Sequence, residues 1–147
     1  MDSAKLNSLA RFCAYQERCI QEIKLKMQKL EIEPEDFQTY ILWLEDNNYL
    51  NETRFAQIFA RSKFNQKQWG RNKIRFELKK RQISAEKIKK GLEEIEDDNY
   101  LQTLEKLIKQ TLKKNSKLDP WQKNQKTVNY LMGRGFEMDL IVSLMKG

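Results

Sequence analysis

The sequence predicts an all-α protein built from tandem three-helix units, and three observations carry this prediction. Helix-forming residues dominate the 147-residue chain, whereas Gly (5) and Pro (2), which turn-rich β architectures need, are scarce. Apolar residues recur at the 3.6-residue period of helices. A segment repeats after 51 residues, a period typical of stacked units that cannot bury their apolar faces alone. We therefore expect about eight helices in an elongated, curved array.

The repeat is clearest in two seven-residue segments. Leu44-Glu45-Asp46-Asn47-Asn48-Tyr49-Leu50 aligns with Ile95-Glu96-Asp97-Asp98-Asn99-Tyr100-Leu101, and five of the seven positions are identical. An offset of 53 pairs later positions, such as Ile83 with Phe136. The offsets predict three units: residues 1–62 with an N-terminal extension, residues 63–117, and an incomplete third unit at residues 118–147.

Three helices are predicted within the first unit. Their apolar faces comprise Ile20, Ile23, Met27 and Leu30; Phe37, Ile41 and Leu44; and Phe55, Ile58 and Phe59. The first of these helices ends where Glu33-Pro34 interrupts it. The third begins at Asn51, because Asn is a favoured N-cap residue.

The second unit repeats this plan, and the third supplies two helices. The apolar positions of the second unit are Ile74 and Leu78; Ile88, Leu92 and Ile95; and Leu104, Leu107, Ile108 and Leu112. Ser84 is the expected N-cap of its middle helix. In the third unit, Asp119-Pro120 leads into a helix, and Gly133-Arg134-Gly135 forms the turn before the last one.

Charge is distributed unevenly along the chain. Residues 1–62 hold 8 Lys and Arg against 10 Asp and Glu, a net charge of −2, whereas residues 63–147 hold 20 against 11, a net charge of +9. A positive field of this kind favours nucleic acid or an acidic protein groove as the partner, without choosing between them.

Two basic stripes are the candidate contact sites for such a partner, whether nucleic acid or an acidic protein groove. Arg71, Arg75 and Lys79 follow one another at steps of four residues, and Lys73, Lys80 and Arg81 flank them. Lys106, Lys109, Lys113 and Lys117 form a ridge opposite the apolar side of a second predicted helix. The alternative interpretation of either stripe is an ordinary solvated face.

Several other residues have simpler structural interpretations. The recurring pairs Tyr49-Leu50 and Tyr100-Leu101 are interpreted as packing residues between helices, and Trp69 and Trp121 as core residues rather than base-stacking platforms. Arg54 is expected to satisfy a nearby carboxylate or helix end. The chain has no histidine, and we find no nucleophile with a base at a recognisable spacing, so no catalysis and no cofactor are expected. Without an apolar signal core or membrane-length apolar stretch, a cytoplasmic protein is expected.

Four segments between residues 18 and 136 resemble the RecX family in order and spacing. Tyr49-Leu50-Asn51-Glu52-Thr53-Arg54-Phe55-Ala56 is similar to the family's Tyr-Leu-Asp-Asp-x-Arg-Phe-Ala, and Trp69-Gly70-Arg71-Asn72-Lys73-Ile74-Arg75-Phe76-Glu77-Leu78 to its Gly-x-x-basic-Ile-x-x-Glu-Leu helix. Arg18-Cys19-Ile20-Gln21-Glu22-Ile23 and Leu131-Met132-Gly133-Arg134-Gly135-Phe136 are similar to its opening and closing motifs. Cys19, Asn51 and Gln82 depart from the family's usual Ser, Asp and Gly, and Gln82 suggests that its helix ends without a left-handed glycine.

The resemblance implies a non-enzymatic modulator that binds the RecA nucleoprotein filament, lies along its groove, and inhibits its ATPase, co-protease and strand-exchange activities. The implied partners are the RecA filament and single-stranded or double-stranded DNA, with no membrane, and the chain is expected to be a monomer. Two other functions remain open. The charge alone would support a basic helical module that binds DNA without RecA. A helical protein scaffold would instead be expected to carry a concave apolar or mixed groove.

Overall fold

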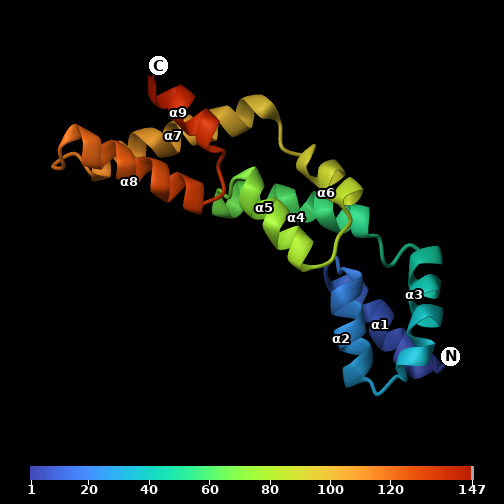
Figure 1. The fold of residues 1–147 in the computed structure, drawn as a ribbon. Coiled ribbons are helices and arrows are strands. Elements are labelled where there is room, and N and C mark those ends of the chain that lie inside the picture. The colour runs from blue at the N-terminus through green and yellow to red at the C-terminus, as the bar shows by residue number, and fades with distance from the viewer. Residues whose placement is uncertain (147) are drawn as a thin grey trace.

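The computed structural model describes residues 1–146, which form an elongated, curved array of helices without a strand. The helices are α1 (Ser3–Tyr15), α2 (Ile20–Lys29), α3 (Phe37–Asp46), α4 (Glu52–Lys67), α5 (Arg71–Lys80), α6 (Ala85–Leu92), α7 (Asp97–Lys114), α8 (Pro120–Gly133) and α9 (Met138–Lys146), with a 3-10 turn, η1 (Pro34–Asp36), before α3. Figure 1 shows α1–α3 at one end, α4–α6 in the middle and α7–α9 at the other end. The all-α fold is confirmed.

The described residues contain nine α-helices rather than about eight, because the expected N-terminal extension is itself the helix α1. Asp2 caps this helix by accepting a hydrogen bond from the Lys5 backbone N–H at 3.0 Å. Leu9 and Cys13 of α1 are buried in the first core. Leu6, Leu9 and Cys13 have helical spacing, so the sequence did contain the signal for α1.

Side-chain caps begin three later helices at the expected residues. Asn51, Ser84 and Asp119 accept hydrogen bonds from the backbone N–H three positions ahead, at 2.9, 3.4 and 2.9 Å. Each bond satisfies a donor that the first helical turn leaves without an intrahelical partner. The predicted starts of α4, α6 and α8 are therefore confirmed.

The same turn recurs between the second and third helices of each group. Glu31, Gln82 and Gly135 adopt left-handed backbone angles, with φ of 60°, 61° and 101°. The residue after each of them is buried and donates its backbone N–H to the carbonyl five positions earlier: Ile32 to Met27, Ile83 to Leu78 and Phe136 to Leu131, at 3.0, 3.2 and 3.0 Å. The helix before Gln82 ends without glycine, as expected, and Gln82 itself adopts the left-handed conformation.

These turns group the helices as α1–α3, α4–α6 and α7–α9, a grouping that differs from the expected divisions at residues 62 and 117. The most extensive helix contact in the described chain joins α4 to α6. Ala56 and Ala60 keep the surface of α4 shallow, and a Cβ on Gly91 of α6 would lie less than 3 Å from the Ala56 backbone. We propose that each group of three helices is one repeat unit.

The apolar core is divided in two. One cluster contains buried residues from Leu9 to Leu50, while the other contains Cys19 and buried residues from Phe55 to Ile141. The middle and last helix groups therefore share a core. The first group meets the middle one through Cys19 and through polar bonds, including the Ile20 N–H to Glu52 at 2.8 Å.

Arg54 fulfils its expected structural role at this polar junction. Its side chain bonds to the Glu17 carboxylate at 2.8 Å and donates to the Asn48 carbonyl at 3.1 Å, just beyond the end of α3. It therefore connects the start of α4 to the loop between α1 and α2 and to the turn after α3.

The interpretation of Tyr49-Leu50 and Tyr100-Leu101 as packing pairs is only half right. Leu50 and Tyr100 are 2% and 0% exposed, whereas Tyr49 and Leu101 are each 37% exposed. Trp121 is also not a core residue, since it is 74% exposed at the start of α8. Trp69 is partly buried and packs edge-on against Phe59, with ring centroids 6.3 Å apart.

Candidate functional site

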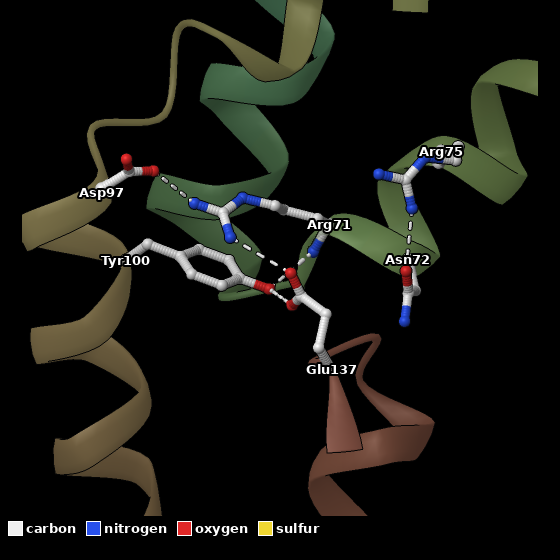
Figure 2. A network of polar contacts seen from close by, with 6 residues as sticks. All are labelled: Arg71, Asn72, Arg75, Asp97, Tyr100 and Glu137. Carbon is white, nitrogen blue, oxygen red and sulfur yellow. Dashed lines mark hydrogen bonds and ion pairs between the residues drawn. The ribbon is translucent and has the colours of Figure 1, made fainter. Parts of the chain in front are cut away.

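Arg71 lies in a polar network that ties α5 to the last helix group, as Figure 2 shows. Its guanidinium forms ion pairs with Asp97 at 2.7 Å and with Glu137 at 3.1 Å, and it lies 3.8 Å from the centre of the Tyr100 ring. The Tyr100 hydroxyl accepts a hydrogen bond from the Arg71 backbone N–H at 2.9 Å and donates one to Glu137. Arg71 thus has a role within the fold, and contact with a partner stays a prediction.

The Tyr100 hydroxyl is held in its protonated form. Burial of the ring raises the pKa of Tyr100 well above its ordinary value, and the hydrogen bond to the Glu137 carboxylate raises it further. A protonated phenol can keep donating to Glu137 across the physiological pH range. The network is therefore a stable junction between α5, α7 and the residue before α9.

Arg75 and Lys79, the other members of the first predicted stripe, line a groove of about 790 Å³ between α5, α6 and the start of α7. Arg75 donates to the Asn72 side chain at 2.8 Å (Figure 2). The other residues that line the groove are the basic residues Arg71 and Lys89, the apolar residues Ala85, Ile88, Leu92 and Ile95, and the acidic residues Glu93, Glu96 and Asp97. The groove is therefore mixed in charge with an apolar floor.

Lys73, Lys80 and Arg81 are absent from the groove lining and contact aromatic rings instead. The Lys73 Nζ lies 4.6 Å from the centre of the Trp69 ring, and the Lys80 Nζ lies 5.6 Å from that of Phe76. The Arg81 guanidinium lies 4.8 Å from the Phe59 centroid. The six basic candidates around α5 therefore do not form one stripe.

Glu77 partly neutralises this second group of cations. It pairs with Lys80 at 3.5 Å and with Arg81 at 3.3 Å. Burial alone would raise the pKa of Glu77, but hydrogen bonds from Arg81 and Lys80, together with their charges, lower it below its ordinary value. Glu77 therefore stays ionised, and Lys73 is without an ion pair among the described residues.

The second predicted stripe lies on α7, apart from the groove. Lys106, Lys109 and Lys113 are exposed on this helix, and Lys109 pairs with Glu105 at 3.1 Å. Lys117 is not part of the helical ridge, because α7 ends at Lys114 and Lys117 lies in the following turn. A shallow depression includes Lys106 and Lys109 but no residue of α5.

The aromatic residues that lie among the cations were only partly anticipated, because Phe76 was not singled out and Trp69 was expected in the core. Phe76 is 61% exposed on α5, and Lys63 of α4 lies 5.1 Å from the centre of the Trp69 ring. The helical spacing did contain a signal for Phe76, because this residue lies outside the Ile74–Leu78 face. The contacts of Lys63 with Trp69 depend on the turn between α4 and α5 and could not be read from spacing.

Residues 1–146 hold neither a cluster of metal ligands nor a helix that could cross a membrane. No group of three or more Cys, Asp or Glu residues in this range is arranged to hold a metal ion. None of its helices combines the length and apolar character that a membrane crossing needs.

Comparisons with known proteins agree on one family. The family model described as the second three-helix domain of RecX matches residues 51–92, and that of the third three-helix domain matches residues 97–145. Regulatory protein RecX of Oceanobacillus iheyensis is 28% identical over 130 residues, covering 88% of this chain and 48% of the relative. Its counterpart in Listeria welshimeri is 26% identical over 135 residues, covering 92% and 50%. The chain therefore spans about half the length of these curated relatives.

Solved structures give the same fold. The crystal structure of RecX from Lactobacillus salivarius has a TM-score of 0.89 at 22% identity, covering 98% of this chain and 94% of that one. A second crystal structure of regulatory protein RecX also has a TM-score of 0.89, at 16% identity, covering 99% and 73%. The two matched domain models begin and end close to the α4–α6 and α7–α9 groups.

Proposed function

Because this chain belongs to the RecX family, we propose that it is a regulator that binds RecA nucleoprotein filaments and lowers their ATPase, co-protease and strand-exchange activities. The observation that carries the proposal is the match of two successive RecX domain models to residues 51–92 and 97–145. The curated relatives are named regulatory proteins, which supports a regulatory rather than a catalytic role.

The proposed mechanism is bridging of neighbouring RecA protomers. An elongated array presents separate basic surfaces along its length, on α5 and on α7. These surfaces would meet DNA phosphates and acidic groups in the filament groove, and the positive field of residues 63–147 would speed the encounter. A bound bridge would oppose the motions that accompany ATP turnover. We expect the protein to act as a cytoplasmic monomer.

ATP hydrolysis by a RecA filament on single-stranded DNA is the direct test. Added protein, at or below an equimolar ratio to RecA, is expected to lower the rate. Unchanged hydrolysis and strand exchange would contradict the proposal.

Two charge-reversal variants would locate the surface that acts on the filament. Arg75→Glu with Lys79→Glu changes the groove, while Lys106→Glu, Lys109→Glu and Lys113→Glu together change the α7 ridge. Arg71 is left intact in both, because its ion pairs support the fold. Loss of inhibition by one variant alone would assign the surface, provided that both keep the wild-type melting temperature. If both inhibit like the wild type, the contacts are elsewhere.

A basic helical module that binds DNA without RecA is the second candidate. The net charge of +9 in residues 63–147 favours it. Such a module would bind bare DNA tightly, with strong salt dependence, while leaving RecA hydrolysis unchanged. The same ATPase assay, run beside a DNA-binding titration, therefore separates the two functions.

A further inference from the structure

An exposed aromatic ring lies between two lysines on the solvent side of α5. Lys73, Phe76 and Lys80 are three and four residues apart, which places them on one face of the helix. Phe76 is 61% exposed, although Ile74 and Leu78 of the same helix are completely buried. The ring is therefore available to a partner and contributes little to the core.

A second aromatic platform lies at the start of this face. Trp69 is partly buried against Phe59, and cations lie near its ring: Lys63 at 5.1 Å and Lys73 at 4.6 Å from the ring centre. Trp69 lies two residues before the first residue of α5, Arg71, and Phe76 lies within the helix. We call Trp69, Lys73, Phe76 and Lys80 the α5 aromatic face.

The charge of α5 favours an anionic partner. The helix holds Arg71, Lys73, Arg75, Lys79 and Lys80 against one acidic residue, Glu77. Glu77 is already paired with Lys80 and Arg81. The field over the face is therefore positive, with Lys73 its least neutralised cation.

We propose that the α5 aromatic face binds single-stranded nucleic acid, with bases stacked on Phe76 and Trp69 and phosphates held by Lys73 and Lys80. Alternating rings and cations suit a flexible single strand, because its bases can turn toward the rings while its backbone follows the charges. Bases in a duplex are already stacked on one another and cannot use an exposed phenyl ring in this way. An acidic protein surface would use the lysines but would gain much less from Phe76.

This inference deepens the proposed function by assigning part of the surface to the nucleic acid of the filament. The binding itself requires no recombinase, so it can be tested on the protein alone. Failure to bind a single strand would leave the ATPase result unaffected. Failure in the ATPase assay would likewise leave the strand-binding result standing.

The repeat provides a matched control for Phe76. Leu25 occupies the equivalent position on α2, 51 residues earlier, and is 55% exposed. Lys29 corresponds to Lys80, but α2 carries Glu22 where α5 carries Lys73. Leu25 therefore has similar exposure and helix position without the aromatic ring or the Lys73 equivalent.

Fluorescence anisotropy of labelled oligothymidylate, titrated with the full chain at low salt, tests the stacking. Phe76→Ala is expected to weaken binding by about tenfold, and Phe76→Trp to restore it, since stacking on one aromatic side chain contributes about 1–3 kcal/mol per base. Leu25→Ala should bind as the wild type does. Circular dichroism melting should be unchanged in all three, since both positions are exposed. Equal binding by Phe76→Ala and Leu25→Ala would overturn the proposal.

Salt dependence tests the phosphate contacts. Lys73→Glu with Lys80→Glu should flatten the slope of log affinity against log salt by about 0.7 for each lost contact, whereas Lys24→Glu with Lys29→Glu on α2 should change it much less. A labelled duplex of equal length should bind more weakly than the single strand and be insensitive to Phe76→Ala. If duplex and single strand bind equally, or if the α2 variant has the same effect, the face only attracts anions in general and the proposal is wrong.

Discussion

Residues 44–50 and 95–101 share five of seven amino acids at an offset of 51, yet they fold differently. In the first copy, Asp46 ends α3, Asn48 has a left-handed φ of 64°, and the chain turns before α4. In the second copy, Asp97 begins α7, so its Tyr and Leu are already helical. As a result, Tyr49 is exposed where Tyr100 is buried, and Leu50 is buried where Leu101 is exposed.

The residues around each copy explain the difference. After Leu50 comes Asn51, whose side chain caps α4, whereas after Leu101 the polar residue is Gln102, a good helix former. Before the second copy, α6 already ends at Leu92, whereas α3 continues into the first copy as far as Asp46. Asp97 and Asp98 then suit the first turn of α7, since acidic side chains stabilise helix N-termini. A repeated motif therefore takes its structure from the capping residues beside it.

The largest expected contrast is between the two tyrosines. Tyr100→Ala should destabilise the fold by about 4 kcal/mol, because it leaves a cavity beside Phe64 and Phe136 and removes the hydroxyl partner of Glu137. Tyr49→Ala should cost about 1 kcal/mol through loss of its stacking on Trp43. Urea unfolding measures both free energies. Equal costs would show that the two copies are equivalent after all.

The leucines should show the opposite order. Leu50→Ala is expected to cost about 3 kcal/mol, as for a fully buried leucine, and Leu101→Ala less than about 1 kcal/mol. Chemical unfolding with a constant m-value would make the comparison valid. A larger cost for Leu101→Ala would place that side chain in the core and contradict the start of α7 at Asp97.

The close contact between Gly70 and Gly135, beside Tyr100, should not accommodate a side chain at position 70. A Cβ on Gly70 would lie less than 3 Å from the backbone of Gly135, and the Gly70 N–H donates to the Arg134 carbonyl at 2.8 Å. Gly70→Ala should therefore destabilise the fold by about 2 kcal/mol. Gly133→Ala is the control, because a Cβ there meets no atom within 4 Å. Thermal melting should show Gly133→Ala to be neutral or slightly stabilising.

Alkaline pH should lower the stability of the fold through Tyr100, the buried tyrosine of the two copies. The folded chain keeps the Tyr100 proton above the ordinary tyrosine pKa of about 10, while the unfolded chain releases it. Because the unfolded state then binds fewer protons, stability falls as pH rises above that value, by up to about 1.4 kcal/mol per pH unit. Tyr100→Phe should reduce this slope, with Tyr49→Phe as the control for losing an exposed hydroxyl. An unchanged slope in Tyr100→Phe would contradict the network.

Local signals predicted most of the helices, whereas contacts between distant residues decided how they group. Apolar spacing and the caps Asn51 and Ser84 were sufficient for α4 and α6. Their pairing was missed because it depends on the close approach of Gly91 to Ala56, which no spacing reveals. The sequence identified Arg71 as a basic residue on a helix, but its ion-pair partners Asp97 and Glu137 lie 26 and 66 positions away in the chain. The role of Arg71 in the fold therefore became visible only in the structure.

The smallest contrast tests the cause assigned to the difference between the copies. Asn51 and Gln102 occupy equivalent positions, but Asn51 accepts the Arg54 N–H at 2.9 Å at the start of α4, while Gln102 is exposed within α7. Asn51→Ala should cost about 1 kcal/mol, because it removes the cap, and Gln102→Ala should be close to neutral, because Ala suits a helix interior. Urea unfolding gives both values, and hydrogen exchange at the first turn of α4 should rise only in Asn51→Ala. If that turn keeps its protection without Asn51, packing of Phe55 and not the cap determines where α4 begins.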